Sequence, residues 1–298
     1  NHTIRKIQIS TGVTTIFAGT AGQSGNIDGI GGEARFNEPM GITIEGDYLY
    51  VSDFKNHSIR KIDISSREVT TLAGTGFSGF LDGLKNSAKF NYPTGLTSND
   101  THLFVADYIN HVIRKIQLSN GNVSTLAGTA QQSGSIDGIG IEAKFFRPIG
   151  ITLDEGNLYV SDEYNHTIRK IDIYSGVVTT IAGNPGISGS EDGTGTNAKF
   201  YKPHGILVDG VYLYVVDYNN HVIRKIELQT GNVITILGSL GESGDTDGEG
   251  NLVKFRYPVS LIKVDFDFFV TDTHSFPPLP APPTTIPICQ VHELPSCA

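Results

Sequence analysis

Short segments with the composition of β-strands recur along the chain in a unit of roughly 55 residues. In one unit, residues 150–153, 158–162, 166–171 and 178–183 are rich in β-branched and aromatic residues, and Gly, Asn or Asp separates them. Turns such as Asn120-Gly121 join the third segment of a unit to the fourth, and no segment has the length of a helix. The pattern predicts four short antiparallel strands in each unit.

Each unit carries the same set of motifs. The string Asn-His-x-Ile-Arg-Lys-Ile begins at Asn1, Asn56, Asn110, Asn165 and Asn220. An Asp-Gly pair follows at Asp28, Asp82, Asp137, Asp192 and Asp247. A Phe-x-x-Pro element ends at Pro39, Pro93, Pro148, Pro203 and Pro258, and an apolar strand then ends at Asp53, Asp107, Asp162, Asp217 and Asp272. Self-similarity at such a period indicates a solenoid, a propeller or another repeat array.

The third strand of the unit indicates which array this is. In residues 111–118, Ile113 lies on one face, while Ile116 and Leu118 lie on the other. A single open sheet would leave one of these apolar rows in water, whereas blades arranged radially cover each other's faces. We therefore predict an all-β fold, a β-propeller of four-stranded antiparallel blades.

The chain enters the repeat partway through a unit. It begins with a third and fourth strand (residues 3–18) and leaves the repeat after a first and second strand (residues 260–271), with four complete units between. These N- and C-terminal half-units are complementary, so we expect them to close a ring of five blades. Six blades are the alternative if the chain is truncated, and pairing of half-units between chains is a third arrangement. Because the chain starts at Asn1, inside a motif and without Met, we expect a processed or truncated product.

Two strings carry a resemblance to a known family. Residues 137–151 read Asp-Gly-x-Gly-x-x-Ala-x-Phe-x-x-Pro-x-Gly-Ile, and residues 158–171 read Leu-Tyr-Val-x-Asp-x-x-Asn-His-x-Ile-Arg-Lys-Ile. Both resemble the NHL repeat, and the resemblance recurs in all five units. It implies a propeller fold, often six-bladed in that family, that mostly serves as a binding platform and has lyase-like and lactonase-like relatives. Fold alone does not choose among these functions.

The repeat ends near residue 274, which predicts two regions. Residues 1–274 are expected to form the propeller, although Pro258-Val259-Ser260 lacks the glycine found in the other units. Residues 275–298 form an irregular Pro-rich tail, expected to be an extended docking strip or spacer, or else a loosely attached terminus. The two cysteines, Cys289 and Cys297, lie in this tail and form either a small disulfide loop or two free thiols.

Composition narrows the classes of partner. The formal net charge of −9 disfavours binding to a nucleic-acid backbone. No run of about 18 apolar residues occurs, so no membrane span is predicted. Asn-x-Ser/Thr sequons stand at Asn1, Asn56, Asn99, Asn122 and Asn165, three of them inside the repeat motif. They favour an extracellular or cell-surface location.

The repeated polar residues are interpreted as structural. A catalytic constellation is a single asymmetric set that includes a nucleophile, whereas here Asp, Asn and His recur in five near-identical copies. The arginines of the same motif are expected to pair with the strand-end aspartates, and they are Arg5, Arg60, Arg114, Arg169 and Arg224. The Asp-Gly loops offer too few carboxylates for calcium, so each aspartate is expected to bond its own turn backbone. No catalytic residue, metal site or cofactor is predicted.

Function should depend on the positions at which the units differ. The residue after the inner-strand proline is expected to line the axial channel, and it varies as Met40, Thr94, Ile149, His204 and Val259. This mostly apolar set disfavours a metal-dependent hydrolase. The residues after the strand-end aspartates supply one aromatic ring per blade, namely Phe54, Tyr108, Tyr164 and Tyr218. These rings form either a partner-binding rim or a cover over the loops.

These observations favour a non-enzymatic, extracellular binding or structural module whose loop face holds a protein partner. One alternative is a subunit of a self-assembling extracellular filament or surface layer, whose partners are identical subunits. Another is a propeller lyase or lactonase-like hydrolase.

Overall fold

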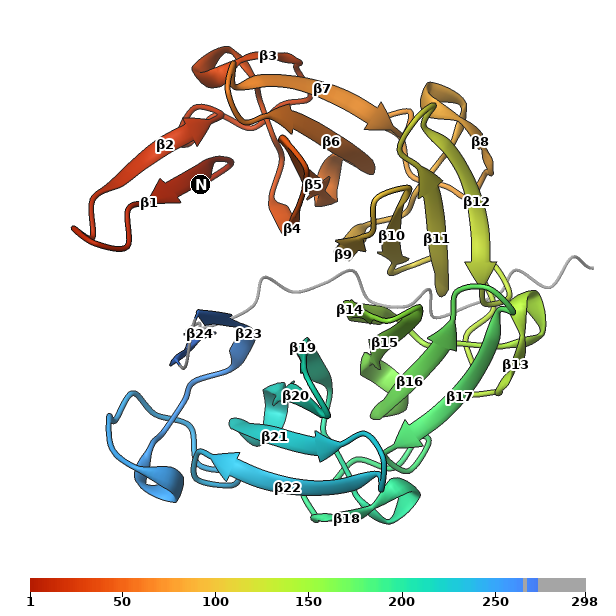
Figure 1. Cartoon of the computed structure of the whole chain (residues 1–298), viewed down its shortest axis with the longest axis vertical. Coiled ribbons are helices and arrows are strands. Elements are labelled where there is room, and N and C mark those ends of the chain that lie inside the picture. The colour runs from red at the N-terminus through yellow and green to blue at the C-terminus, as the bar shows by residue number, and fades with distance from the viewer. Residues whose placement is uncertain (265–266, 273–298) are drawn as a thin grey trace, which may run out of the picture.

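The computed structural model describes residues 1–264 and 267–272. These residues form β-strands and short 3-10 helices, arranged as sheets around a central axis (Figure 1). The Pro-rich tail 275–298, Cys289, Cys297 and the boundary after residue 274 lie outside the described residues. The all-β propeller predicted from the repeat is confirmed.

Four sheets are complete blades of five strands each. The first blade contains β3 (Gly29–Ile30), β4 (Pro39–Glu45), β5 (Tyr48–Asp53), β6 (Ser58–Asp63) and β7 (Glu68–Ala73). The second contains β8 (Gly83–Leu84), β9 (Pro93–Ser98), β10 (His102–Asp107), β11 (Val112–Gln117) and β12 (Asn122–Ala127). The third contains β13 (Gly138–Ile139), β14 (Pro148–Asp154), β15 (Asn157–Asp162), β16 (Thr167–Asp172) and β17 (Val177–Ala182). The fourth contains β18 (Gly193–Thr194), β19 (Pro203–Asp209), β20 (Tyr212–Asp217), β21 (Val222–Glu227) and β22 (Asn232–Leu237).

Short 3-10 helices occupy the connections. Five lie near the Asp-Gly loops: η1 (Gly31–Glu33), η3 (Lys85–Ser87), η4 (Gly140–Glu142), η6 (Gly195–Asn197) and η8 (Gly250–Leu252). Three follow the strand-end aspartates: η2 (Phe54–Asn56), η5 (Glu163–Asn165) and η7 (Tyr218–Asn220). In the described part of the chain, no helix has the length and apolar composition needed to cross a membrane.

Each complete blade has one strand more than the sequence predicted. In the third blade the order is β13-β17-β16-β15-β14, with β14 nearest the axis (Figure 1). The four longer strands are the predicted ones, and consecutive strands pair antiparallel. The fifth, β13, has only two residues and pairs with the outer strand through Gly138 opposite Val178. A strand this short carries no alternation of apolar and polar residues, so the sequence pattern could not reveal it.

The two half-units form separate sheets. β1 (Ile4–Ile7) pairs with β2 (Thr14–Ala18), and β23 (Pro258–Val264) pairs with β24 (Asp267–Asp272). We call these the N-terminal and C-terminal half-blades. Within the described residues no pairing joins β1 to β24, and the two half-blades occupy different places around the axis (Figure 1). The composite blade expected to close the ring is therefore not formed within this chain.

A buried ionic network holds each complete blade together. In the first blade, the guanidinium of Arg60 is fully buried and contacts the carboxylates of Asp53 at 2.7 Å and Asp28 at 2.6 Å. Asn56 donates to Asp53 at 2.8 Å and to the carbonyl oxygen of Gly25 at 2.6 Å. The same contacts recur around Arg114, Arg169 and Arg224. The structural role predicted for the Asp, Asn and Arg motif is confirmed in these four blades.

Two expectations about this network are wrong. Asp28 does not bond its own turn; its carboxylate accepts hydrogen bonds from Arg60 and from Thr71 of the outer strand β7. Arg5 has no ion pair in the described residues and is exposed, because the half-blade that contains it lacks a strand-end aspartate. The network therefore requires a complete blade.

The histidine of the motif connects one blade to the next. His57 follows η2 in the left-handed region, with φ of 51°, and its Nδ1 accepts a hydrogen bond from the Tyr92 backbone at 3.1 Å. His111, His166 and His221 make the same contact with the next unit. Inner strands also approach closely, since a Cβ on Gly41 would lie 2.4 Å from the Thr94 carbonyl oxygen. These contacts explain why His and Gly recur in every complete unit.

Candidate functional site

The predicted axial residues line a single cavity. Its volume is about 100 Å³, and the five varying positions that line it are Met40, Thr94, Ile149, His204 and Val259. Thr94, Ile149 and His204 are buried, whereas Met40 and Val259 are half-buried. A cavity this small and mostly apolar admits a few waters rather than a substrate of ordinary size.

The predicted aromatic rim divides into two kinds of residue. Phe54 and Tyr108 are 3% and 0% exposed, so the prediction of an exposed ring is wrong at these two positions. Phe54 packs against Tyr92 of the next blade, with ring centroids 4.7 Å apart. Tyr164 and Tyr218 are half-buried and therefore partly accessible. The first pair therefore covers the loops, and only the second pair can touch a partner directly.

A polar cluster that the repeat did not predict lies beside the axis. Glu163, 2% exposed, stands where the first, second and fourth blades have an aromatic residue. Its carboxylate accepts a hydrogen bond from the Tyr108 hydroxyl at 2.7 Å. Lys202 Nζ and His204 Nε2 each lie 3.6 Å from the other carboxylate oxygen. This Glu163 cluster joins the second, third and fourth blades at a point where the propeller is not symmetric.

Electrostatics favour an ionised Glu163. Burial alone would raise the pKa of its carboxyl, but His204, the Tyr108 hydroxyl and Lys202 outweigh burial, and the pKa is lowered. Burial, followed by the nearby Glu163 charge, raises the pKa of Tyr108, which keeps the phenol protonated as a donor. A buried carboxylate with such partners is a stable structural anchor. Because neither Glu163 nor His204 is accessible, the arrangement does not present an acid–base pair to a substrate.

Arg147 connects this cluster to the accessible ring of Tyr164. Its side chain is 2% exposed, and the guanidinium carbon lies 5.3 Å from the Tyr108 ring centroid and 4.8 Å from that of Tyr164. It also donates to the Tyr164 hydroxyl at 3.2 Å. On the other side, His204 stacks on Tyr218 with ring centroids 4.0 Å apart and an interplanar angle of 10°. The Glu163 cluster therefore fixes the two accessible rings of the rim.

Six accessible aromatic residues gather on the same side of the ring. We call them the aromatic face: Tyr92, Phe146, Tyr164, Tyr201, Tyr218 and Tyr257. All lie where a second strand has ended or an inner strand begins. Their rings pair across these loops, with centroids 5.0 Å apart for Phe146 and Tyr164 and 5.1 Å for Tyr218 and Tyr257. Tyr201 is the most accessible, at 40% exposed.

Sequence reasoning missed Arg147, Lys202 and the aromatic positions next to them. These residues belong to the pair that directly precedes the inner-strand proline of each unit. The pairs are Asn37-Glu38, Asn91-Tyr92, Phe146-Arg147, Tyr201-Lys202 and Arg256-Tyr257. This variation within an otherwise regular motif was an available signal. The strand-end variation at Glu163 was visible, but its contact with the neighbouring blades required the fold.

The described residues contain no group of three or more His, Cys, Asp or Glu side chains placed to hold a metal ion. In the four complete blades the loop aspartates are engaged by arginine and threonine, as at Asp28. The polar groups of the aromatic face are hydroxyls and cations carried beside aromatic rings. Such a surface suits the binding of another macromolecule.

Comparison with known proteins agrees with this architecture. The family model described as NHL repeat matches residues 145–171, and that described as LVIVD repeat matches residues 38–74. NHL repeat-containing protein 2 of Homo sapiens is 29% identical over a 315-residue alignment covering 75% of this chain and 43% of that protein. Protein SUPPRESSOR OF QUENCHING 1, chloroplastic, of Arabidopsis thaliana is 29% identical over 276 residues, covering 86% of this chain and 26% of that protein. The chain thus spans less than half the length of these curated relatives.

Solved structures share the fold at low sequence identity. A chain in a nidogen/laminin complex superposes with a TM-score of 0.61 at 15% identity, covering 91% of this chain and 82% of that chain. An auxiliary nutrient binding protein from Bacteroides thetaiotaomicron gives 0.55 at 16% identity, covering 86% and 72%. Virginiamycin B lyase from Staphylococcus aureus gives 0.53 at 15% identity, covering 91% and 70%. At these identities the likeness is one of fold.

Proposed function

The chain is an NHL-repeat β-propeller, and we propose that it is a non-enzymatic binding module that holds a protein partner on its aromatic face. The observation that carries this proposal is the set of six accessible aromatic residues on one side of the ring. Tyrosine is enriched among the residues that dominate binding energy at protein interfaces, because it combines a large apolar surface with a hydroxyl.

Rigid positioning of these rings supports the proposal. Two cations contact the Tyr164 ring: the buried guanidinium of Arg147, and the ammonium of Lys202 at 4.2 Å from the ring centroid. Tyr218 is stacked on the buried His204 ring. A side chain already held in one orientation loses little conformational entropy when a partner binds. The buried Glu163 cluster therefore contributes to binding without touching the partner.

The aromatic face also differs from blade to blade around the ring. The Glu163 cluster joins the second, third and fourth blades, and the equivalent position in the first blade is the buried Phe54. A partner would therefore meet different groups at each blade, which fixes its orientation. Among the structural neighbours, the nidogen/laminin structure is described as a complex. By analogy of fold, it illustrates that a ring of this kind can engage a protein.

The proposed location is extracellular or at the cell surface. Among the sequons, Asn56 and Asn165 are buried with their amides donated to Asp53 and Asp162, so a glycan there would disrupt the blade. Asn122 is exposed at the start of β12 and leaves room for a glycan. Peptide mapping of the native protein with and without a glycosidase should find a modification at Asn122. Its absence from secreted material would remove this support.

The proposed function can be tested with a photo-crosslinking residue in place of Tyr201, introduced in the native host. The matched control replaces Tyr174, which is 85% exposed in the turn between β16 and β17 on the opposite side of the ring. We expect the Tyr201 probe to capture a defined protein that the Tyr174 probe does not. Tyr164→Ala should abolish this capture. Equal capture at both positions, or none at Tyr201, would contradict the proposal.

A lyase or lactonase-like activity is the second candidate. The observation in its favour is the asymmetric Glu163 cluster, which contains a carboxylate, an imidazole and a phenol. A substrate would have to displace the side chains that bury Glu163 and His204. Turnover of a lactone panel that is lost in Glu163→Gln, with unchanged stability, would support this candidate over the first.

A further inference from the structure

A pocket lies where the end of β7 in the first blade meets the second blade (Figure 1). Its volume is about 340 Å³. The first blade contributes residues of β6 and β7, and the second contributes η3 and the turn between β11 and β12. We call it the lysine pocket after Lys61 and Lys85, and Thr70, Ser119 and Asn120 add further polar groups to its walls.

Lys85 occupies a backbone position at which the other four units have glycine. Its φ is 39°, in the left-handed region, and the equivalent glycines have φ between 53° and 58°. These glycines are Gly31, Gly140, Gly195 and Gly250. The backbone bond is also unchanged, since Lys85 donates to the Gly121 carbonyl oxygen at 2.9 Å, as Gly140 does to that of Gly176. Backbone strain of this kind is retained mostly where a side chain has a function, so the Lys85 ammonium is a candidate binding group.

Both lysines are held at the pocket. The stem of Lys85 runs across Gly121, where a Cβ would lie 2.8 Å from the lysine Cγ. The ammonium of Lys61 lies 3.4 Å from the ring centroid of Tyr48. In the described part of the chain neither lysine has an ion pair, and none of the residues that line the pocket is acidic. Two ammonium groups without a carboxylate partner attract an anion.

Hydrogen-bond donors stand beside the lysines. The hydroxyls of Thr70 and Ser119 make no hydrogen bond within residues 1–264 and 267–272. Asn120 accepts from the Asn122 backbone and donates one amide proton to Gln117, which leaves its second amide proton free. Ammonium, hydroxyl and amide donors together match the oxygens of a phosphate, sulfate or carboxylate group.

A second pocket adjoins the first. Its volume is about 310 Å³, and Thr71 lines both pockets. Asn26 and Asn86 also line it, and Asn86 directly follows Lys85. Neither asparagine side chain makes a hydrogen bond to another described residue. The two pockets therefore offer an anion-binding part and a neutral amide-lined part side by side.

The second pocket suits hydroxyl groups. Amides and threonine hydroxyls both donate and accept, as a sugar hydroxyl does. The carboxylate of Asp28 also lines the pocket; it is paired with Arg60 at 2.6 Å, and its side chain is 48% exposed and can accept from a hydroxyl. No aromatic or aliphatic side chain is among the described residues that line this pocket, so it does not suit a nucleobase or a lipid chain.

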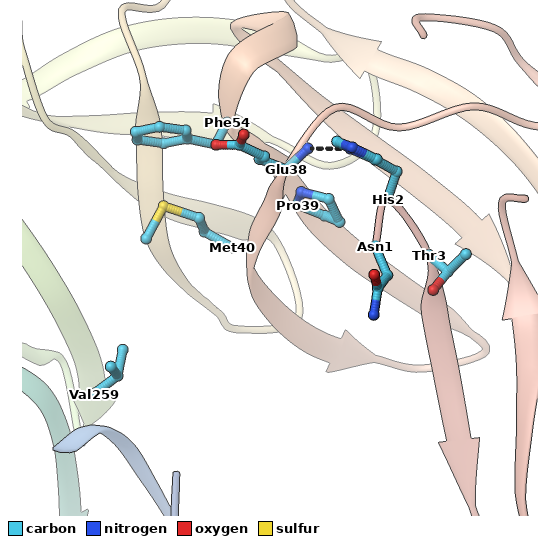
Figure 2. Close-up of a pocket in the computed structure, with 8 residues that line it drawn as sticks. All are labelled: Asn1, His2, Thr3, Glu38, Pro39, Met40, Phe54 and Val259. Atoms are coloured by element: carbon cyan, nitrogen blue, oxygen red, sulfur yellow. Dashed lines mark hydrogen bonds between the residues drawn. The ribbon is translucent and has the colours of Figure 1, made fainter. Parts of the chain in front are cut away.

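Equivalent places in the molecule lack this combination. Between the second and third blades, the positions of the two asparagines and of Lys85 are occupied by Phe80, Ile141 and Gly140. The pocket shown in Figure 2 has the same volume as the lysine pocket, about 340 Å³, but Glu38 lines it and no lysine or arginine of the described chain does. The two adjoining pockets are therefore a local feature rather than a property of every blade.

We propose that these two pockets together bind a sugar that carries an anionic group, either a sugar phosphate or a sugar acid. The anionic group would contact Lys61 and Lys85, and the sugar hydroxyls would pair with Asn26 and Asn86. This inference goes beyond the proposed function, because the site is separate from the aromatic face. Its turn between β11 and β12 is the counterpart of the turn that holds Tyr174, on the opposite side of the ring.

The test measures binding to the full chain by isothermal titration calorimetry. The probes are a glucose phosphate monoester, glucuronate, glucose and inorganic phosphate. We expect at least one of the two sugar anions to bind, and glucose and inorganic phosphate each to bind about tenfold more weakly or less. The preferred sugar anion identifies the source of the negative charge.

Lys85→Gly separates binding from folding, because it removes the ammonium and restores the residue of the other units. The affinity for the sugar anion should fall by about tenfold or more. The urea midpoint should be unchanged or higher, since the left-handed strain is relieved. Arg67→Gly is the matched control: Arg67 has φ of 61° where the other units have glycine, and it lines neither pocket. It changes the net charge equally and should leave the affinity unchanged.

Three results would overturn the proposal. Absence of binding by both sugar anions at millimolar concentration would exclude the site. Inorganic phosphate that binds as tightly as the glucose phosphate would reduce the site to general attraction of anions. Equal losses in Lys85→Gly and Arg67→Gly would attribute binding to net charge alone. None of these residues belongs to the aromatic face, so failure here leaves the proposed function to its own test.

Discussion

A Cβ placed on Gly150 would lie 2.1 Å from the carbonyl oxygen of His204, across the boundary between the third and fourth blades. The inner strands β14 and β19 therefore approach each other as closely as two backbones can. This contact also carries His204 to its place beside the axis, where it meets Glu163 and Tyr218. Glycine at position 150 is therefore needed both for the close packing of the two blades and for the placement of His204 in the Glu163 cluster.

Gly150→Ala should therefore destabilise the protein. The added methyl group cannot fit without separating two blades, and overpacking of this kind costs about 1–3 kcal/mol or more. Gly32→Ala is the matched control, since a Cβ there would be 4.0 Å from the nearest atom, the Thr20 hydroxyl oxygen. Urea unfolding should show a lower midpoint for the first variant only. Equal midpoints would mean that the blades can separate freely.

Arg169→Lys should be strongly destabilising. The guanidinium spans Asp162 at 2.8 Å and Asp137 at 2.7 Å, and a lysine ammonium cannot reach both carboxylates. Leaving a buried carboxylate without its partner costs about 3–5 kcal/mol. Arg5→Lys, at the exposed copy of the motif, should change the free energy of unfolding little in dilute solution. Similar losses in both variants would contradict the structural role given to the network.

The stability of the fold should fall in mild acid. Burial, helped by the Arg147 charge, lowers the pKa of His111 to about 4, and burial also lowers the pKa of His57, His166 and His221. Because the unfolded imidazole has a pKa of about 6.5, the unfolded state binds more protons between about pH 6.5 and 4. The free energy of unfolding therefore decreases as the pH falls through that window, by on the order of 3 kcal/mol for His111 alone.

His111→Asn isolates this effect. Asparagine tolerates the φ of 61° found at this position and can still accept from the Arg147 backbone, but it does not titrate. Urea midpoints measured from neutral to mildly acid pH should decline less steeply in this variant than in the wild type. An identical slope would show that His111 does not contribute to the pH dependence.

The Tyr108–Glu163 bond can be measured by a double-mutant cycle. Glu163→Leu leaves the buried Tyr108 hydroxyl without its acceptor, which should cost about 1–3 kcal/mol. Adding Tyr108→Phe removes that stranded group and should recover part of the loss. The four free energies of unfolding give the coupling energy. Additive effects of the two substitutions would contradict the hydrogen bond as a source of stability.

Much of the fold follows from the repeat itself. The sequence shows short apolar strands joined by Asn-Gly turns, with apolar residues on both faces, as at Ile113 and Ile116. Such strands require blades that cover one another, and in the structure both isoleucines are buried. The outermost two-residue strands were not predictable, because pairing at Gly138 depends on where the loop returns across the blade. Nor could the sequence reveal whether the half-blades meet, since that depends on the angle between successive blades.

The candidate site was less predictable than the fold. The axial position of His204 followed from the motif, and the structure places it in the axial cavity. The burial of Tyr108 did not follow, because it results from Glu163 and Arg147 of the next unit closing over the ring. Contacts between units depend on residues that differ from copy to copy. A motif averaged over copies hides those residues.

The return of β13 across the third blade also affects how the protein is made. β13 is the first strand of its blade to be synthesised, and its partner β17 is the last. A blade emerging from the ribosome therefore cannot close its outer edge until its final strand has left the exit tunnel. We expect folding during translation to advance in steps of one repeat, because domains and repeats fold as units once their contacts are available. Ribosome pausing within a strand such as β17 would expose an unfinished edge, whereas pausing in the following Asp-Gly loop would not.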